Sequence, residues 1–333
     1  MSLAQVIGTL VKTGMHGEAH EDVHEFSEQE AYDLFAAILD GGLPELELGA
    51  ALALLRCHRT TLPELLGFHS ALIERRYRLK LPSAAARPVV FSSYFGAHAQ
   101  PNLLPLLALV LQHLGVPVLV HGALNSSGRV ASAYIFRELG VMPCFNLAQA
   151  QAQLEEHKVA FVPTAVLAPG LAELLSLRGR LGFDNIATTM VKLLDPFDDE
   201  SLLVVAGNDS MQQELLRGFL RLRGSNTLLL ESTEGEAFAN PQRRPELEYF
   251  RDGEPQMLFE AETFPLKNFA FLPQAVDAAS TALWIRRVLG GEAPLPLPLV
   301  NQIACCLYGA GYTQDMNQAK AIVAVETGSL IVA

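Results

Sequence analysis

Apolar side chains recur at two different spacings along the chain, and the change of spacing divides it into two parts. In the first part, Ser27 and Glu30 form a capping-box pattern, and apolar residues follow at helical spacing. Pro44–Leu55 and Pro63–Leu79 repeat the helical pattern. The pattern therefore predicts a small all-helical unit over residues 1–80, followed by a connector rich in proline and alanine.

Beyond the connector, short apolar runs alternate with longer helical stretches. Five runs are candidate strands: Val89–Phe91, Val116–Val120, Ala160–Val162, Leu202–Ala206 and Thr227–Leu230. The helical stretches between them suit crossover connections in an α/β domain. Residues 232–262 are polar and acidic and predict irregular structure or a hairpin, and helical periodicity returns over Gln274–Leu289 and Pro298–Thr327.

Composition narrows the class of protein. The 333 residues are 50% hydrophobic, enough for a large core, and the net charge is −12. As a whole-chain average, this charge argues against binding to nucleic acid or to a membrane surface, because phosphate groups attract Lys and Arg. Four cysteines without a CxxC pair and an N-terminus without a secretory pattern predict a cytoplasmic protein. Prolines and polar residues interrupt the apolar run Leu103–Val120, which predicts a buried helix and strand, with no membrane contact.

Three segments resemble anthranilate phosphoribosyltransferase and the wider glycosyltransferase family 3. SEQEAYDLFAAILDGGLPELELGAALALL from Ser27 is similar to the opening helices of the family, and residues 288–330 are similar to its closing helices. Arg178–Gly182, followed by Leu193 and Pro196, resembles its RxxLG…LxNP segment. The resemblance implies an N-terminal helical dimerisation domain over residues 1–80. It also implies an α/β domain over residues 81–333 with a central mixed sheet, the nucleoside phosphorylase/phosphoribosyltransferase fold.

The motifs that bind substrate in this family are altered in the chain. Family enzymes hold phosphoribosyl pyrophosphate on a GTGGDG loop, whose glycines let backbone N–H groups approach the pyrophosphate. An alignment anchored on Asn102 and Gly115 puts a different sequence there: Ser92, Ser93, Tyr94, Phe95 and Gly96. Two aromatic rings replace glycines and the aspartate is missing, so the resemblance implies a degenerate phosphoribosyl pyrophosphate loop.

Two further motifs are incomplete. The family's KHGNR reads VHGAL here, which keeps His121 and Gly122 but loses the Lys, Asn and Arg, while Arg129 falls where the family has a phosphate-contacting lysine. The Asp-Glu pair that holds Mg²⁺ in the family aligns with GEAF, where a shift would recruit Glu234 or Glu236, and no adjacent Asp-Glu pair exists nearby. Mg²⁺ is therefore expected only if the chain is a transferase after all.

A scaffold with these losses resembles the TrpD-like branch of the family exemplified by YbiB. That resemblance implies a homodimer without catalytic residues, cofactor or metal, which binds single- or double-stranded nucleic acid with little sequence preference. Segmental charge agrees with it: residues 51–192 hold thirteen Lys and Arg against seven Asp and Glu, a balance of +6, and the remainder carries −18. Ten basic residues are candidate nucleic-acid contacts: Arg56, Arg59, Arg75, Arg76, Arg78, Lys80, Arg129, Arg178, Arg180 and Lys192.

Structural interpretations compete with these roles. Arg75–Lys80 also suits a helix C-terminus, where basic residues interact with the helix dipole, and Arg178 has Glu173 and Asp184 within reach as ion-pair partners. Packing is favoured over base stacking for the aromatic pair in the degenerate loop. Metal binding is disfavoured for the evenly spaced histidines His16, His20 and His24.

Three functions follow from the sequence. The first is non-enzymatic binding of nucleic acid through a basic groove in residues 51–192. The second is a glycosyl- or phosphoribosyltransferase with an altered substrate, using His121, Arg129 and Arg178. The third, supported only by the acidic remainder, is a protein-interaction scaffold.

Overall fold

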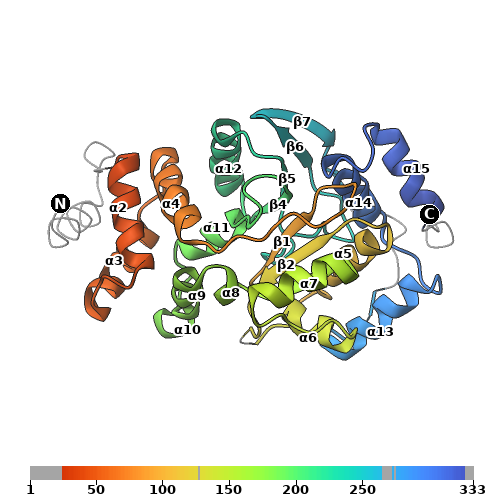
Figure 1. Cartoon of the computed structure of the whole chain (residues 1–333), viewed down its shortest axis with the longest axis horizontal. Helices are drawn as coiled ribbons and strands as arrows, with labels where there is room; N and C mark the ends of the chain where they lie inside the picture. Colours follow the sequence, from red (N-terminus) through yellow and green to blue (C-terminus); the bar gives the residue numbers. More distant parts are fainter. Residues whose placement is uncertain (1–24, 127, 265–271, 274, 327–333) are drawn as a thin grey trace. The chain divides into compact units, whose positions relative to one another are not determined.

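The computed structural model describes residues 25–126, 128–264, 272–273 and 275–326, which belong to two compact units (Figure 1). One unit joins the residues up to Tyr77 with Ala168–Leu194, and the other joins Arg78–Leu167 with the residues from Asp195 onward. The predicted boundary after residue 80 does not assign Ala168–Leu194 to the helical unit. The packing partners of this segment lie more than a hundred positions earlier in the chain, so no local pattern indicates them.

The first unit is helical. It contains α2 (Glu28–Leu39), α3 (Glu45–Cys57), α4 (Leu62–Arg75), α9 (Pro169–Ser176), α10 (Arg178–Leu181), α11 (Ala187–Met190) and the 3₁₀ turn η1 (Val191–Leu193). The capping box of Ser27 and Glu30 is present at the start of α2. Two glycines allow close packing, since a Cβ at Gly67 in α4 or at Gly170 in α9 would lie 2.2 Å from a carbonyl oxygen of α2.

The helix α4 ends at Arg75, four residues before the predicted end at Leu79. The backbone of Arg76 is extended, with φ −84° and ψ 149°, and the Leu79 N–H donates to the Pro196 carbonyl at 3.0 Å. This bond replaces the helical partner that Leu79 would need. The interpretation of residues 76–80 as a helix C-terminus is therefore wrong, and the helix-dipole explanation applies to Arg75 alone.

The second unit is an α/β domain. Its strands are β1 (Val89–Ser93), β2 (Val118–Gly122), β3 (Val159–Pro163), β4 (Leu202–Gly207), β5 (Thr227–Glu231), β6 (Leu247–Arg251) and β7 (Glu254–Phe259). Its helices are α5 (Leu104–His113), α6 (Ser132–Glu138), α7 (Leu147–His157), α8 (Thr164–Leu167), α12 (Ser210–Arg223), α13 (Ala278–Leu289), α14 (Leu297–Gly309) and α15 (Met316–Glu326). All five predicted strands are present, the acidic segment contributes the hairpin β6–β7, and the predicted last helix is divided into α14 and α15.

The seven strands form one mixed sheet in the order β3-β2-β1-β4-β5-β6-β7. The first five are parallel, and β6 and β7 are antiparallel to their neighbours, which confirms the expected mixed sheet. The strand order reverses between β1 and β4, so the chain leaves these two strands in opposite directions across the sheet. In open α/β sheets, ligands bind at the carboxyl ends of the strands at such a switch point.

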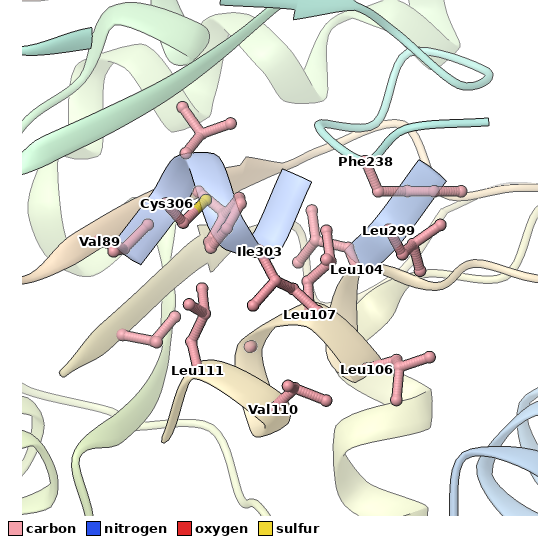
Figure 2. Packing of buried hydrophobic residues seen from close by; sticks show 14 of the residues in the cluster. Val89, Leu104, Leu106, Leu107, Val110, Leu111, Phe238, Leu299, Ile303 and Cys306 are labelled. Carbon is pink, nitrogen blue, oxygen red and sulfur yellow. The ribbon is translucent and has the colours of Figure 1, made fainter. Parts of the chain in front are cut away.

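The core of this unit lies between the sheet and the helices α5 and α14. Figure 2 shows Leu104, Leu107 and Leu111 of α5 close to Ile303 and Cys306 of α14. Burial of each such side chain contributes ~1.5–3 kcal/mol relative to an exposed position. The apolar run from residue 103 to 120 is therefore a core helix and strand, and no helix among the described residues is long and apolar enough to span a bilayer.

Candidate functional site

The loop after β1 lies at the switch point, and its own side chains pack into the space beside its backbone. Phe95 is 6% exposed, and a Cβ at Gly235 would lie 2.6 Å from its ring, so the ring packs directly against that glycine's backbone. Tyr94 is half-buried and meets Phe95 edge-on, with ring centres 5.5 Å apart. Gly96 has φ +69°, and a Cβ there would lie 2.9 Å from the Val130 carbonyl oxygen. The Phe95 ring serves packing, as the structural interpretation predicts, and presents no face to a base.

The buried carboxylate of Glu236, in the loop after β5, accepts hydrogen bonds from the loop after β1. Glu236 is 0% exposed, and one of its carboxylate oxygens accepts the Gly96 N–H at 2.7 Å. The other oxygen accepts the Ser93 hydroxyl at 2.6 Å, and the Ser93 Oγ also lies 2.7 Å from the Ser132 Oγ. The Asn102 amide donates to that second hydroxyl at 3.0 Å. These donors satisfy a carboxylate that would otherwise be costly to bury.

A second carboxylate from the same loop binds the backbone that follows Gly96. Glu234, in the left-handed region at φ 55°, accepts the N–H groups of His98 at 2.8 Å, Ala99 at 3.1 Å and Gln100 at 2.8 Å. The His98 Nδ1 lies 2.6 Å from the same carboxylate. Burial raises the pKa of the Glu234 carboxyl, but these hydrogen bonds outweigh it and hold the pKa below its ordinary value of 4.5. Consecutive N–H groups of this kind form an anion-binding concavity, and here the anion is the protein's own side chain.

Arg129 connects the loop after β1 to the loop after β5. Its Nη1 donates to the carbonyl oxygens of Gly96 at 3.2 Å and Glu234 at 3.3 Å, and lies 3.9 Å from the Glu234 carboxylate. The guanidinium that the alignment assigns to phosphate is thus engaged with backbone carbonyls. The side chain remains 26% exposed, so part of its charge faces solvent.

The His-Gly motif at the end of β2 has a structural cause. A Cβ at Gly122 would lie 1.8 Å from the Ser93 carbonyl oxygen, so only glycine permits this strand pairing. His121 is 0% exposed within β2. A side chain buried to this degree has no access to a bound substrate in this conformation, which removes a participant that the transferase hypothesis requires.

The residues at the switch point do not fit Mg²⁺. The ion needs free carboxylate oxygens, whereas both carboxylates here accept N–H and O–H donors. Across the described ranges, no three His, Cys, Asp or Glu side chains are grouped so that they would hold a metal ion. The histidines at 16, 20 and 24 lie outside the described residues.

The candidate basic residues of the helical unit fall into two groups. Arg56 and Arg59 are exposed, at and just beyond the end of α3, and within the described part of the chain neither makes an ion pair. The others are paired or buried: Arg75 with Asp40 at 2.8 Å, Arg178 with Asp184 at 2.8 Å, Arg180 with Glu45 at 3.3 Å, and Arg76 and Lys192 at 8% and 2% exposure. The ion pair of Arg178 is one of the two that the sequence suggested.

The α/β unit holds the remaining candidates. Arg78 is exposed and lies 3.2 Å from Asp198, and Lys80 is exposed without an ion pair among the described residues. Neither belongs to the closed loops at the switch point. Among the described residues, the candidates that are exposed and make no ion pair are therefore Arg56, Arg59 and Lys80.

The sequence suggests Glu234 and Glu236 only as substitutes for magnesium ligands. Their actual partners lie 134 to 143 positions away, so helical or strand periodicity gives no sign of them. The usable signal is the local sequence Glu-Gly-Glu directly after a strand, which predicts a tight turn with two carboxylates at the carboxyl edge of the sheet.

Several known proteins are similar to this chain. A family model described as the helical bundle domain of the glycosyl transferase family matches residues 14–76. The protein YbiB of Escherichia coli is 36% identical over 308 residues, which cover 92% of this chain and 96% of YbiB. Anthranilate phosphoribosyltransferase of Novosphingobium aromaticivorans is 26% identical, covering 92% of this chain and 93% of the enzyme.

Two solved structures show the same fold. Anthranilate phosphoribosyltransferase (TrpD) of Thermus thermophilus aligns with a TM-score of 0.74 at 21% identity, covering 97% of this chain and 94% of that one. The Saccharomyces cerevisiae enzyme in complex with phosphoribosyl pyrophosphate and Mg aligns at 0.71 and 14% identity, covering 99% and 94%. At these identities the likeness concerns the fold alone.

Proposed function

The chain belongs to the TrpD-like family of glycosyl transferases, and on that premise we propose that it is a non-catalytic member that binds nucleic acid without sequence preference. The proposed absence of catalysis is supported by the pair of internal carboxylates. Glu234 and Glu236 take up the backbone N–H groups of the loop after β1, so a pyrophosphate would have to displace two bonded carboxylates before it could bind.

The uneven distribution of charge along the chain supports the proposed binding of nucleic acid. The segment 51–192 has a balance of +6 within a chain of −12, and Arg56, Arg59 and Lys80 present charges that no described acidic side chain neutralises. Such residues bind phosphates through charge and carry no base information, so binding of this kind is non-specific and weakens with salt. We further propose that the protein is a cytoplasmic homodimer that associates through its helical unit, so that each strand meets two copies of these cations.

A titration of labelled single- and double-stranded oligonucleotides at two salt concentrations tests the proposal. We expect binding at micromolar protein in low salt that falls steeply as salt rises. No binding at low salt overturns the proposed function. Light scattering of the same sample tests the dimer, which predicts twice the mass of the chain.

The alternative is a transferase with an altered substrate. It is favoured by the similarity to anthranilate phosphoribosyltransferases along 92% of the chain. It requires that Glu234 and Glu236 give up their hydrogen bonds to the loop after β1. Arg129 would also have to leave its two backbone carbonyl oxygens in order to bind a phosphate. Measurable binding of phosphoribosyl pyrophosphate with Mg²⁺ would establish it.

A further inference from the structure

A fully buried carboxylate connects separate segments of the helical unit. Glu64, the third residue of α4, is 0% exposed. One of its oxygens accepts the N–H of Phe26, which lies just before α2, at 3.0 Å. The other accepts the N–H of Thr61, the residue that caps α4, at 2.8 Å. The side chain therefore binds the backbone at the starts of two helices.

His58, at the end of α3, is a further partner of this carboxylate. Its Nε2 lies 2.8 Å from one oxygen of Glu64 and 3.0 Å from the other, and its side chain is 5% exposed. Burial raises the pKa of the Glu64 carboxyl, but the hydrogen bonds outweigh burial and hold the pKa below its ordinary value of 4.5. Because the carboxylate has no proton to donate, Nε2 carries the hydrogen. The contact therefore holds the turn between α3 and α4 against the start of α4.

The charge of the His58 ring decides whether the buried carboxylate has a counter-ion. Two carboxylates act on the ring: Glu64 from α4, and Glu25 from the segment before α2. The hydrogen bond to Glu64 raises the pKa of His58 above its ordinary value of 6.5, although burial opposes this rise. The ion pair is therefore complete below pH 6.5, and Glu64 loses its counter-ion as pH rises through the raised pKa. The contact is strongest when His58 is protonated.

Two exposed arginines lie on either side of His58 in the chain. Arg56 is in the last turn of α3 and Arg59 directly follows His58, and neither makes an ion pair among the described residues. His58 itself has an extended backbone, with φ −81° and ψ 137°, and its N–H donates to the Leu54 carbonyl at 2.9 Å. The contact with Glu64 thus orders the backbone that carries both arginines. Side chains on an ordered backbone lose less conformational freedom when they bind a phosphate.

We infer that the contact between His58 and Glu64 positions Arg56 and Arg59 for nucleic acid, and that loss of the His58 proton weakens the binding of a strand. The inference rests on the proposed function and deepens it, because it names a pH-dependent regulation of the binding site. His58 is a positioning residue, since its buried ring is not accessible to a phosphate. The proton and the strand then favour each other's binding by the same factor.

Fluorescence anisotropy of a labelled oligothymidylate with the full chain, at constant ionic strength, tests this regulation. In the wild type, the Kd should rise about fivefold between pH 6 and pH 9, which is the lower end of the coupling usual between two sites. His58→Gln replaces the ring by a neutral donor and should lose this pH dependence. His113→Gln changes an exposed histidine at the end of α5, and as the matched control it should keep the pH dependence of the wild type.

Glu64→Gln separates positioning from the effect of charge alone. The variant removes a negative charge next to the turn that carries the arginines, so charge alone predicts tighter binding of the strand. Positioning predicts binding about fivefold weaker at pH 6, because the contact that holds the turn is lost. Tighter binding would therefore overturn the inference. Glu173→Gln, which changes an exposed glutamate of α9 without an ion pair among the described residues, is the control and should not weaken binding.

An NMR titration of His58 in the wild type provides a readout that needs no variant. Saturating oligothymidylate should lower the proton dissociation constant of His58 about fivefold, because the coupling is reciprocal. If the strand leaves the His58 titration unchanged, or if the wild type and His58→Gln have the same pH profile of binding, the inference fails and the proposed function stands. If the wild type binds no strand at pH 6 in low salt, both fail.

Discussion

Replacing Glu234 by glutamine perturbs the internal anion of the degenerate loop while keeping the size of the side chain. The carboxylate is 13% exposed and accepts three backbone N–H groups and the His98 ring nitrogen. A hydrogen bond to a charged group contributes about 1.5–3 kcal/mol, compared with about 1 kcal/mol for a neutral one. Glutamine retains a neutral acceptor, and water reaches the exposed N–H groups of the loop. We therefore expect a loss of about 1–2 kcal/mol in the free energy of unfolding at pH 7, well below the sum of the separate bonds.

The same substitution should change how stability depends on pH. Because the folded pKa of Glu234 lies below its ordinary value of 4.5, its contribution is complete above that value and is lost as pH falls through the lowered one. Urea unfolding of the wild type and of Glu234→Gln should therefore differ fully at pH 7 and converge below pH 4.5. Glu214→Gln is the control, since that carboxylate is 73% exposed and has a single ion pair within α12. A difference that is absent at pH 7, or constant down to acidic pH, refutes the reasoning.

Removing the side chain should also reopen the anion site. In Glu234→Ala the three N–H groups are left to water, and inorganic pyrophosphate should then stabilise the protein, by about 1.4 kcal/mol when its concentration is ten times the dissociation constant. The wild type should show no such stabilisation in the same thermal-shift titration. Equal stabilisation of both proteins would mean that the carboxylate does not occupy the anion site.

Further predictions concern three other places. Gly96→Ala should lower the free energy of unfolding by about 1–3 kcal/mol, because alanine is strained at positive φ and its Cβ meets a facing carbonyl oxygen; unchanged urea unfolding would contradict this. The hydrogen bond to the Glu64 carboxylate raises the pKa of His58, so NMR should find His58 titrating above 6.5; the stabilisation from this pair should be complete below pH 6.5 and be lost as pH rises through the raised pKa. Arg56→Glu combined with Arg59→Glu should weaken oligonucleotide binding and reduce its salt slope without a change in melting temperature, whereas unchanged binding would remove these two residues from the interface.

Periodicity predicts the elements of this chain well because it depends on neighbouring residues. The capping box at Ser27 and the apolar strand that begins at Val89 are local patterns, and both are present where the sequence places them. The sequence places the end of α4 four residues too late, because the Leu79 N–H bonds to the carbonyl of Pro196, which is more than a hundred residues away. Long-range bonds of this kind leave no local pattern.

The candidate site shows the same limit. The family resemblance, with Tyr94 and Phe95 in place of glycines and the aspartate missing, predicts a degenerate pyrophosphate loop, and this stays a prediction. The sequence suggests Glu234 and Glu236 only as metal ligands, because it does not show which donors a carboxylate meets after folding. Likewise, the count of basic residues predicts a positive segment, but only the structure separates Arg56, which is unpaired among the described residues, from Lys192, which is buried.

Calorimetric titration of the full chain with phosphoribosyl pyrophosphate and Mg²⁺ tests the central claim most directly. The internal carboxylates occupy the N–H groups that a pyrophosphate would use, and the same carboxylates are not free to hold the metal. The account predicts no saturable heat for the wild type, with binding of pyrophosphate restored in Glu234→Ala. Saturable, magnesium-dependent binding to the wild type would contradict the account and establish the transferase alternative.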